Sequence, residues 1–421
     1  VNKVLAALLS VARVCIMTKQ DFGAWSYAYN IASFFIIFNG LGATSALLQL
    51  GSELAGNKLS TESLTRYATH CGIVCDLLMG AFIAICAVAV PLAVDGANRL
   101  LVLYCLFPLL SFLYEMKLTV LRIHLRNREY ALLTNVQTVV NFAFSIIGAF
   151  LYGAIGLVIG QQLALIAVWT LGLAGPRCLR GGEGRSRAVK ITVEEGASSH
   201  LGISRETYWK IALMSAFNNG LSQMLTLVGT FFVGLFLASD TAVAEYKVAT
   251  TVPFALLFLP SIVCTYIYPY FARHKNDARW TFRSFLATIG ASTLGFALLT
   301  TLLALFAEPL VLLLFGEAYA DTVPVLRVLL LGFFLAASFR QVSVNLLVTQ
   351  RKLGVNSAIS IVSIVVNVGG SIAFIPSFGM TGAAWVWTVT MGVGAVLSTA
   401  CYLHVLRKLG RKEMREVRDG I

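Results

Sequence analysis

The chain has 421 residues, of which 58% are hydrophobic and only 12% are charged, and its mean hydropathy is +0.80. A soluble protein carries roughly 25% charged residues, so this composition excludes a soluble protein. The formal net charge is +12, but the basic residues lie in short breaks between apolar runs, where membrane proteins place them. We therefore expect no nucleic-acid partner.

The apolar runs predict an all-α integral membrane protein of about twelve transmembrane helices, since one helical span needs about 20 apolar residues. The first apolar run is shorter than about 20 residues, and we therefore expect the first helix to be truncated. In chain order, the predicted spans are 1–17, 22–50, 67–91, 99–121, 129–151, 153–175, 208–238, 242–272, 281–307, 323–349, 354–375 and 382–406.

The charges in the breaks predict the orientation of the spans. Alternate breaks are rich in Arg and Lys, whereas the break at 308–322 contains Glu308, Glu317 and Asp321. Because cytoplasmic loops carry the basic excess, both termini are predicted to be cytoplasmic. The longest polar segment, 176–207, is rich in Gly, Ser and Arg. We interpret it as a flexible cytoplasmic linker.

The linker separates two predicted lobes of six helices, 1–175 and 208–406, and a basic cytoplasmic tail, 407–421, follows. An internal repeat supports this division, because Asn141, Ser145, Gly153 and Gly156 recur 226 positions later as Asn367, Ser371, Gly379 and Gly382. Six spans per half give both halves the same orientation. We therefore expect a parallel pseudo-two-fold repeat with a central cleft, as in transporters.

One polar stripe lies along the predicted span 208–238. Its residues fall on one arc of the helix at 100° per residue. Such a stripe forms interhelical hydrogen bonds in many bundles, or it lines a hydrated cavity that admits sugars. The candidate sugar-facing residues are Ser215, Asn219, Ser222, Gln223 and Thr226.

Charged residues within spans are the other candidates, since a charge at mid-bilayer costs roughly 2.5–3.5 kcal/mol on insertion scales. Arg340 and Asp76 lie deep in their spans, and either they neutralise each other or Arg340 meets an anionic substrate. Arg13 and Lys117 are further candidate ligands of an anion. Asp76 and Glu115 are candidates for ion coupling.

The sequence contains no catalytic motif, no phosphate-binding loop and no metal-ligand spacing. The eight cysteines form no CxxC pair, and most lie in apolar runs. We therefore expect neither an enzyme nor a metal or other cofactor.

Several segments resemble a known family. They are KQDFGAWSYAYNIASFF near the start, 245–271, VLLLFGEAYADTVPVLRVLLLG at 311–332 and IVVNVGGSIAFIPSFGMTGAAWVWTVT at 364–390. Their order and spacing are similar to those of O-antigen and exopolysaccharide flippases of the multidrug/oligosaccharidyl-lipid/polysaccharide exporter superfamily. One departure is Gly229-Thr230, where family members often carry an acidic residue.

The resemblance implies a flippase of the bacterial inner membrane that translocates an undecaprenyl-diphosphate-linked oligosaccharide by alternating access. Arg340, Arg13 and Lys117 would then contact the diphosphate. The lipid-linked oligosaccharide and membrane lipids are the implied partners, and a glycan polymerase and export machinery are further candidates. Two alternatives remain open: a multidrug-and-toxin extrusion antiporter of the same superfamily, and a scaffold that holds glycan-assembly enzymes through its basic linker and tail.

Overall fold

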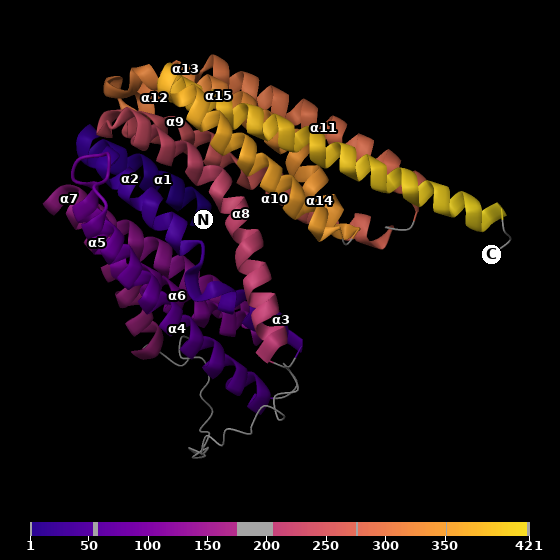
Figure 1. Ribbon diagram of the computed structural model, residues 1–421, viewed down its shortest axis with the longest axis horizontal. Coiled ribbons are helices and arrows are strands. Elements are labelled where there is room, and N and C mark those ends of the chain that lie inside the picture. The colour runs from indigo at the N-terminus through magenta and orange to yellow at the C-terminus, as the bar shows by residue number, and fades with distance from the viewer. Residues whose placement is uncertain (1, 54–57, 175–204, 275–276, 351, 419–421) are drawn as a thin grey trace. The chain divides into compact units, whose positions relative to one another are not determined.

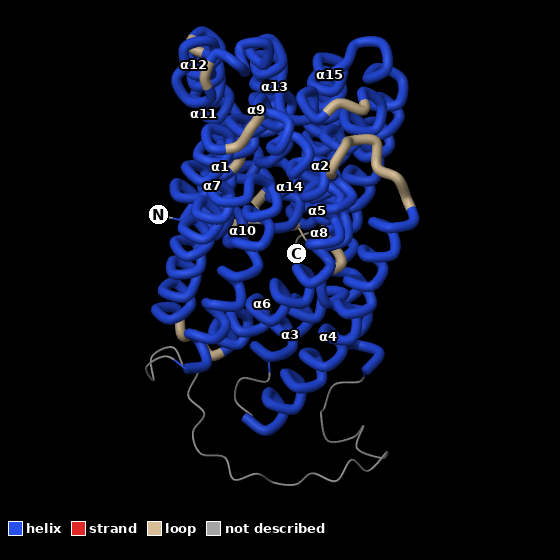
Figure 2. The backbone as a smooth tube through the Cα atoms, turned by 90° about the vertical axis from the view of Figure 1, so that its left-hand side faces the viewer, coloured by secondary structure: helices blue, strands red, loops and turns tan. Residues whose placement is uncertain are grey.

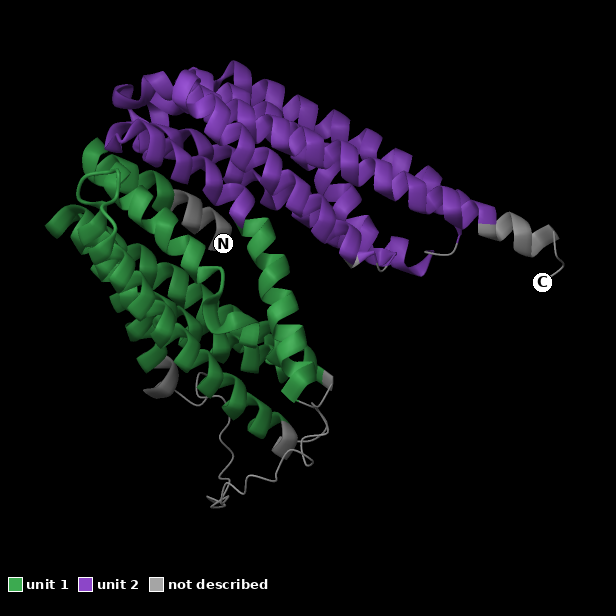
Figure 3. Ribbon diagram, viewed as in Figure 1, with its two compact units in different colours: residues 1–223 green, residues 224–421 purple. Residues whose placement is uncertain are grey.

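The computed structural model describes residues 2–53, 58–174, 205–274, 277–350 and 352–418. Helices account for most of these residues, and none of them forms a β-strand (Figure 2). The chain divides into two compact units, unit 1 (Val1–Gln223) and unit 2 (Met224–Ile421) (Figure 3). Helix α8 (Arg205–Leu237) contributes its first part to unit 1 and its second part to unit 2.

The helices are those of a membrane protein. Nine helical segments within the described residues are long and apolar enough to cross a bilayer. Large apolar side chains on them are exposed, for example Val88 at 81%, Phe150 at 80% and Leu294 at 76%. Such surfaces are stable in hydrocarbon and unfavourable in water. The predicted class, an all-α protein that crosses the membrane several times, is confirmed.

Two of these segments are helical hairpins. The first lies in α7 (Asn127–Ala174), whose helical backbone is interrupted at Tyr152 and Gly153. An added Cβ at Gly148 would collide with the carbonyl oxygen of Gly156, and one at Gly160 would collide with that of Phe144. In a straight helix, residues 144 and 160 would be about 24 Å apart. The chain therefore turns back at residues 152–153.

The second hairpin lies in α15 (Leu353–Arg418), which is interrupted at Gly379. A Cβ at Gly382 would lie 2.7 Å from the carbonyl oxygen of Phe374, and one at Gly370 would lie 3.0 Å from the side chain of Val386. Its two arms are therefore antiparallel neighbours. The breaks predicted between 151 and 153 and between 375 and 382 fall at or beside the two hairpin turns.

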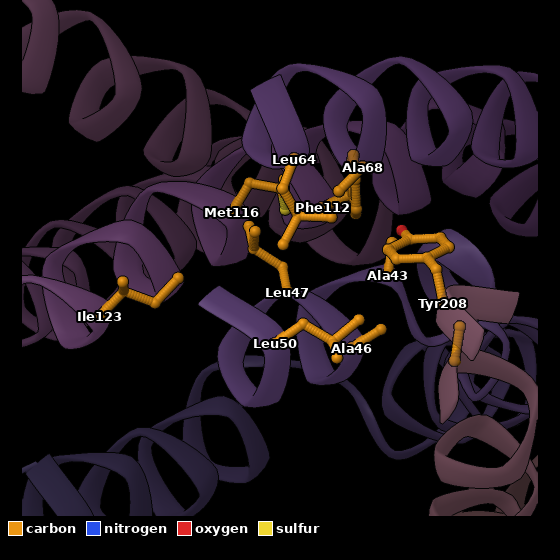
Figure 4. Packing of buried hydrophobic residues seen from close by; sticks show 11 residues of the cluster. Ala43, Ala46, Leu47, Leu50, Leu64, Ala68, Phe112, Met116, Ile123 and Tyr208 are labelled. Carbon is orange, nitrogen blue, oxygen red and sulfur yellow. The ribbon is translucent and has the colours of Figure 1, made fainter. Parts of the chain in front are cut away.

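Unit 1 contains the first seven α-helices, with the 3-10 turns η1 (Asn39–Gly42) and η2 (Tyr104–Leu106) (Figure 1). One of its buried apolar clusters joins α3, α4 and α6 to the start of α8, where Leu47, Phe112 and Tyr208 are buried together (Figure 4). The remaining helices are α1 (Asn2–Ile16), α2 (Lys19–Ile36), α3 (Ala43–Glu53), α4 (Lys58–Ala89), α5 (Ala97–Leu103) and α6 (Phe107–Ile123).

Unit 2 is built around α13, which packs against α9, α11 and α15. One of its buried clusters includes Phe285, Leu346 and Tyr402 from α11, α14 and α15. The elements before α15 are α9 (Asp240–Leu256), α10 (Phe258–Arg273), α11 (Ala278–Leu305), α12 (Ala307–Phe315), η4 (Glu317–Thr322), α13 (Val323–Leu335), the π-helical turn η5 (Ala336–Arg340) and α14 (Gln341–Thr349).

Some details differ from the predictions. The break at 308–322 contains the short helix α12, and the predicted span 22–50 is interrupted by η1, where Gly40 and Leu41 have positive φ. Residues 176–204 of the predicted linker lie outside the described residues. The division into lobes at 176–207, the count of twelve spans and the repeat as a whole stay predictions.

Candidate functional site

Arg340 is the last residue of η5, a single π-helical turn between α13 and α14. Such turns occur often at functional positions because they re-aim one side chain. The Arg340 side chain lies against Gly394 of α15, where an added Cβ would be 2.9 Å from both its Cδ and its Nε. Its Nε is buried and has no hydrogen-bond partner among the described residues.

A row of buried polar side chains begins beside Arg340. Ser363 Oγ lies 3.3 Å from the same Cβ position at Gly394. Ser363, Asn367 and Ser371 follow at four-residue spacing on one face of α15 and are 0–1% exposed. Their side-chain polar atoms have no hydrogen-bond partners among the described residues. Buried polar groups of this kind normally bind water or a ligand.

Arg13, on α1 in unit 1, faces aromatic rings. Its guanidinium carbon lies 5.0 Å from the centroid of the Trp25 ring, a cation–π distance. The Tyr29 ring stacks on the same Trp25 ring, with 5.5 Å between the two ring centroids. The Nε of Arg13 is buried without a hydrogen-bond partner among the described residues. The aromatic ring lowers the cost of burying this cation but does not neutralise it.

A hydrogen-bond chain fixes the Trp25 ring. Trp25 Nε1 donates to the Tyr104 hydroxyl at 2.9 Å, and Tyr104 donates to Gln161 Oε1 at 2.8 Å. All three side chains are buried, at 3%, 0% and 6% exposure. They come from α2, η2 and α7, so the chain ties three parts of unit 1 together. Sequence reasoning missed this network, because isolated Tyr and Gln residues in apolar spans carry no recognisable motif.

Asp76 of α4 has local partners. The Gly40 N–H donates to its Oδ1 at 2.8 Å. The Asn39 amide also faces the carboxylate, and with its nitrogen oriented to donate it lies 2.8 Å from Oδ2. Asp76 is 0% exposed. It therefore holds the break at η1, a structural role that leaves its predicted part in ion coupling untested.

Glu115 and Lys117 of α6 lie on different faces of the helix, since two residues turn it by about 200°. Glu115 is exposed on unit 1, and Lys117 is half-buried. Arg122, a candidate partner of Glu115 by its spacing, instead lies over the Tyr130 ring at 5.2 Å. Within the described residues neither Glu115 nor Lys117 takes part in an ion pair.

The polar stripe of α8 differs in exposure along its length. Asn219, Ser222 and Gln223 are exposed within unit 1. Ser215 and Thr226 are half-buried. A stripe used only for helix packing would be buried in its unit, so the exposed members favour contact with solvent or a polar ligand.

Gly229 of α8 explains one departure from the family pattern. An added Cβ there would lie 2.5 Å from the hydroxyl oxygen of Tyr246, whose ring is 1% exposed. The Tyr246 hydroxyl therefore occupies the space beside this position. A side chain at Gly229 would require the buried Tyr246 ring to move.

The described residues contain no group of three or more His, Cys, Asp or Glu side chains that could hold a metal ion. Two of the candidate residues, Arg13 and Arg340, lie in polar regions of different units. Unit 1 holds Arg13 on its aromatic support, and unit 2 holds Arg340 beside the polar row of α15. Each region presents a cation without a carboxylate partner among the described residues.

Comparison with known proteins gives one family. The model of a family described as polysaccharide biosynthesis protein matches residues 11–176 and 205–324, which make up more than half of the chain. Among curated proteins, none matches the sequence.

Solved structures share the fold over nearly the whole chain. An inward-facing multidrug resistance MATE family transporter of the MOP superfamily is 16% identical and has a TM-score of 0.67, with 96% of this chain and 99% of that chain covered. The lipid II flippase MurJ in its inward closed conformation is 13% identical and has a TM-score of 0.63, with 97% and 88% covered. The fold is that of MOP-superfamily transporters.

Proposed function

The chain belongs to the polysaccharide biosynthesis protein family, and from this membership we propose that it is a flippase for an undecaprenyl-diphosphate-linked oligosaccharide. It would move this lipid from the cytoplasmic to the periplasmic leaflet of the bacterial inner membrane by alternating access. The sugar unit would be an O-antigen or exopolysaccharide repeat. The proposal involves transport and no enzymatic step.

The observation that supports an anionic substrate is the state of the two arginines Arg13 and Arg340. A buried charge is costly unless it is paired. Arg13 and Arg340 have no ion-pair partner among the described residues, and each has a buried Nε without an acceptor. An anionic headgroup would supply the missing partner. Charge-assisted hydrogen bonds to phosphate oxygens suit Arg in particular. Lys117 is the third proposed diphosphate contact.

The proposed sugar contacts lie on α8. Asn219, Ser222 and Gln223 expose amide and hydroxyl groups that can both donate and accept hydrogen bonds. A sugar requires both donors and acceptors, since each of its hydroxyl groups donates and accepts hydrogen bonds. Ser215 and Thr226 extend this wall by one turn on either side.

The alternative is an antiporter for cationic compounds, because the fold is also that of MATE transporters. Such a protein needs accessible carboxylates for its cargo. Asp76 is fully buried and accepts the Gly40 N–H. Glu115 is then the one remaining candidate carboxylate. The balance of charges therefore favours the anionic substrate.

The test uses glycan export in a strain that lacks the gene and is complemented with variants of the full chain. Arg340→Ala should reduce export roughly ten- to hundredfold at unchanged protein level, since a hydrogen bond to a charged group contributes about 1.5–3 kcal/mol. The matched control is Arg283→Ala, because Arg283 is an exposed residue of α11. It should export normally.

A second variant tests the position of Arg340 and leaves its charge in place. Gly394→Ala places a methyl group 2.9 Å from Arg340 Cδ and Nε and should displace the side chain. We expect export to fall severalfold. Full export in both variants would remove Arg340 from the site. Normal surface glycan in the deletion strain, with altered resistance to cationic compounds, would contradict the flippase and favour the antiporter.

A further inference from the structure

A groove of about 290 Å³ lies between α11 and α13 of unit 2. Its volume is at the lower end of the range for ligand pockets. The lining is mostly apolar and contains one charged side chain, Arg327. The lining residues are Ala297, Thr300, Thr301, Ala304, Arg327, Leu330, Leu331 and Phe334.

Arg327 is held at the end of the groove. Its Nε donates to the carbonyl oxygen of Ala304, in the last turn of α11, at 3.2 Å. The side chain is exposed, and within the described part of the chain it takes part in no ion pair. A guanidinium has five N–H donors, so this one bond leaves the four on the Nη atoms for a ligand. Thr301, also exposed, adds a hydroxyl to the same lining.

The surroundings of the groove are those of a lipid-facing surface. In the most apolar stretch of α11, only 17% of the residues are buried, the lowest share of the nine candidate spans of the described residues. Beside the groove, Leu298, Leu302 and Leu305 are 72%, 51% and 70% exposed. Side chains of this kind face acyl chains in a membrane. We therefore expect the apolar part of this surface to contact acyl chains.

The depth of Arg327 matches that of lipid phosphates. Ala304 lies one residue before the end of α11, and Arg327 lies in the second turn of α13. Both ends adjoin the break at 308–322, which contains Glu308, Glu317 and Asp321. Arg327 therefore lies where the hydrocarbon meets the headgroups, while Leu331 and Phe334 lie one and two turns deeper.

We propose that this groove is a binding site for one anionic phospholipid. The phosphodiester accepts hydrogen bonds from the Nη atoms of Arg327 and from the Thr301 hydroxyl. One acyl chain lies along Leu331 and Phe334. This lipid is a bound component of unit 2, distinct from any transported cargo, and the site does not depend on the proposed flippase function. The net negative charge of the headgroup complements Arg327, the one charged side chain that lines the groove.

The test measures lipid binding to the purified full chain in a non-ionic detergent by native mass spectrometry and by thermal unfolding. Phosphatidylglycerol should bind wild type at least tenfold more tightly than phosphatidylcholine and should raise the unfolding temperature, because a ligand of the folded state stabilises it. Arg327→Gln should remove this preference. Arg283→Gln, at the other end of α11, should keep it.

Further arms separate the remaining interpretations. Ala297→Leu narrows the groove and leaves Arg327 in place, so it should weaken phosphatidylglycerol binding severalfold. This variant also provides a readout if Arg327→Gln does not fold. Inorganic phosphate alone should have no effect. Equal binding of the two phospholipids to wild type, an unchanged preference in both groove variants, or displacement of phosphatidylglycerol by undecaprenyl phosphate would overturn the proposal.

Discussion

Three charged side chains within the membrane spans, Asp76, Arg13 and Arg340, have local environments that indicate their use. Asp76 is bound by the Gly40 N–H, so its negative charge supports the backbone of η1. Arg13 lies over Trp25 and Arg340 lies beside Gly394, and neither has a carboxylate partner among the described residues. The cations are thus available for an external anion, whereas the deepest carboxylate is already used.

At this scale, substitutions of Asp76 separate a structural role from ion coupling. Asp76→Ala leaves the buried Gly40 N–H without an acceptor, which costs about 1–3 kcal/mol. Asp76→Asn keeps an acceptor oxygen and should cost less. We expect the unfolding temperature to fall more for Ala than for Asn. The measurement is thermal unfolding of the two purified variants.

Export by the same two variants gives an independent readout. If Asp76 only holds η1, Asp76→Asn should export normally, because its carboxamide retains the contact with Gly40. Loss of export in a variant that remains as stable as wild type would instead assign the carboxylate to coupling. An equal loss of stability in both variants would contradict the role at η1.

Among the elements, the two hairpins α7 and α15 have the same backbone conformation at one glycine of each turn. Gly153 has φ 57° and ψ −136°, and Gly379 has φ 56° and ψ −139°. This region of the backbone is nearly closed to residues with a Cβ. The two glycines are 226 positions apart and belong to the predicted repeat. The same local conformation at both supports the repeat at this pair of positions.

Substitution of Gly379 tests whether the turn of α15 requires a glycine. Nothing lies within 4 Å of an added Cβ there, so the effect of Gly379→Ala comes from the backbone alone. We expect a destabilisation of about 1–3 kcal/mol. The matched control is Gly290→Ala within α11, which also has open space and should be neutral or stabilising by up to about 1 kcal/mol.

Both Gly379→Ala and Gly290→Ala are compared with wild type by thermal unfolding in the same detergent. A fall in unfolding temperature confined to Gly379→Ala supports the strained turn. Equal effects of the two substitutions would show that the turn at Gly379 tolerates a side chain, and the conformational argument would then fail.

On the scale of the whole molecule, the orientation in the membrane is predicted from charge alone. The break 122–128 is basic and the break 308–322 is acidic, so the two are expected on opposite sides. The expected arrangement has both termini in the cytoplasm. It requires an even number of spans, and each hairpin contributes two.

Reporter fusions measure this arrangement. Alkaline phosphatase, which is active only in the periplasm, should be active when fused within 308–322 and inactive when fused at 122–128 or at the C-terminus. Green fluorescent protein should give the reverse pattern. An active phosphatase at the C-terminus would contradict both the orientation and the even number of spans.

Composition and pattern were sufficient to predict the class of the protein, because hydrocarbon tolerates only helices with paired backbone groups and few charges. The positions of most spans followed for the same reason. The deep charges were also visible, since a single Arg in an apolar run is conspicuous. The resemblance of several short segments then indicated the family, which the family model confirms.

What each polar side chain contacts was decided only by the tertiary structure. Three features join residues of different elements: the Trp25–Tyr104–Gln161 chain, the bond from Gly40 to Asp76 and the groove at Arg327. The burial of Ser363, Asn367 and Ser371 depends on how one face of α15 packs on its neighbours. Apolar periodicity shows that a helix is buried or faces lipid, but not which neighbour it meets. Partners are set by packing geometry, which no single helix encodes.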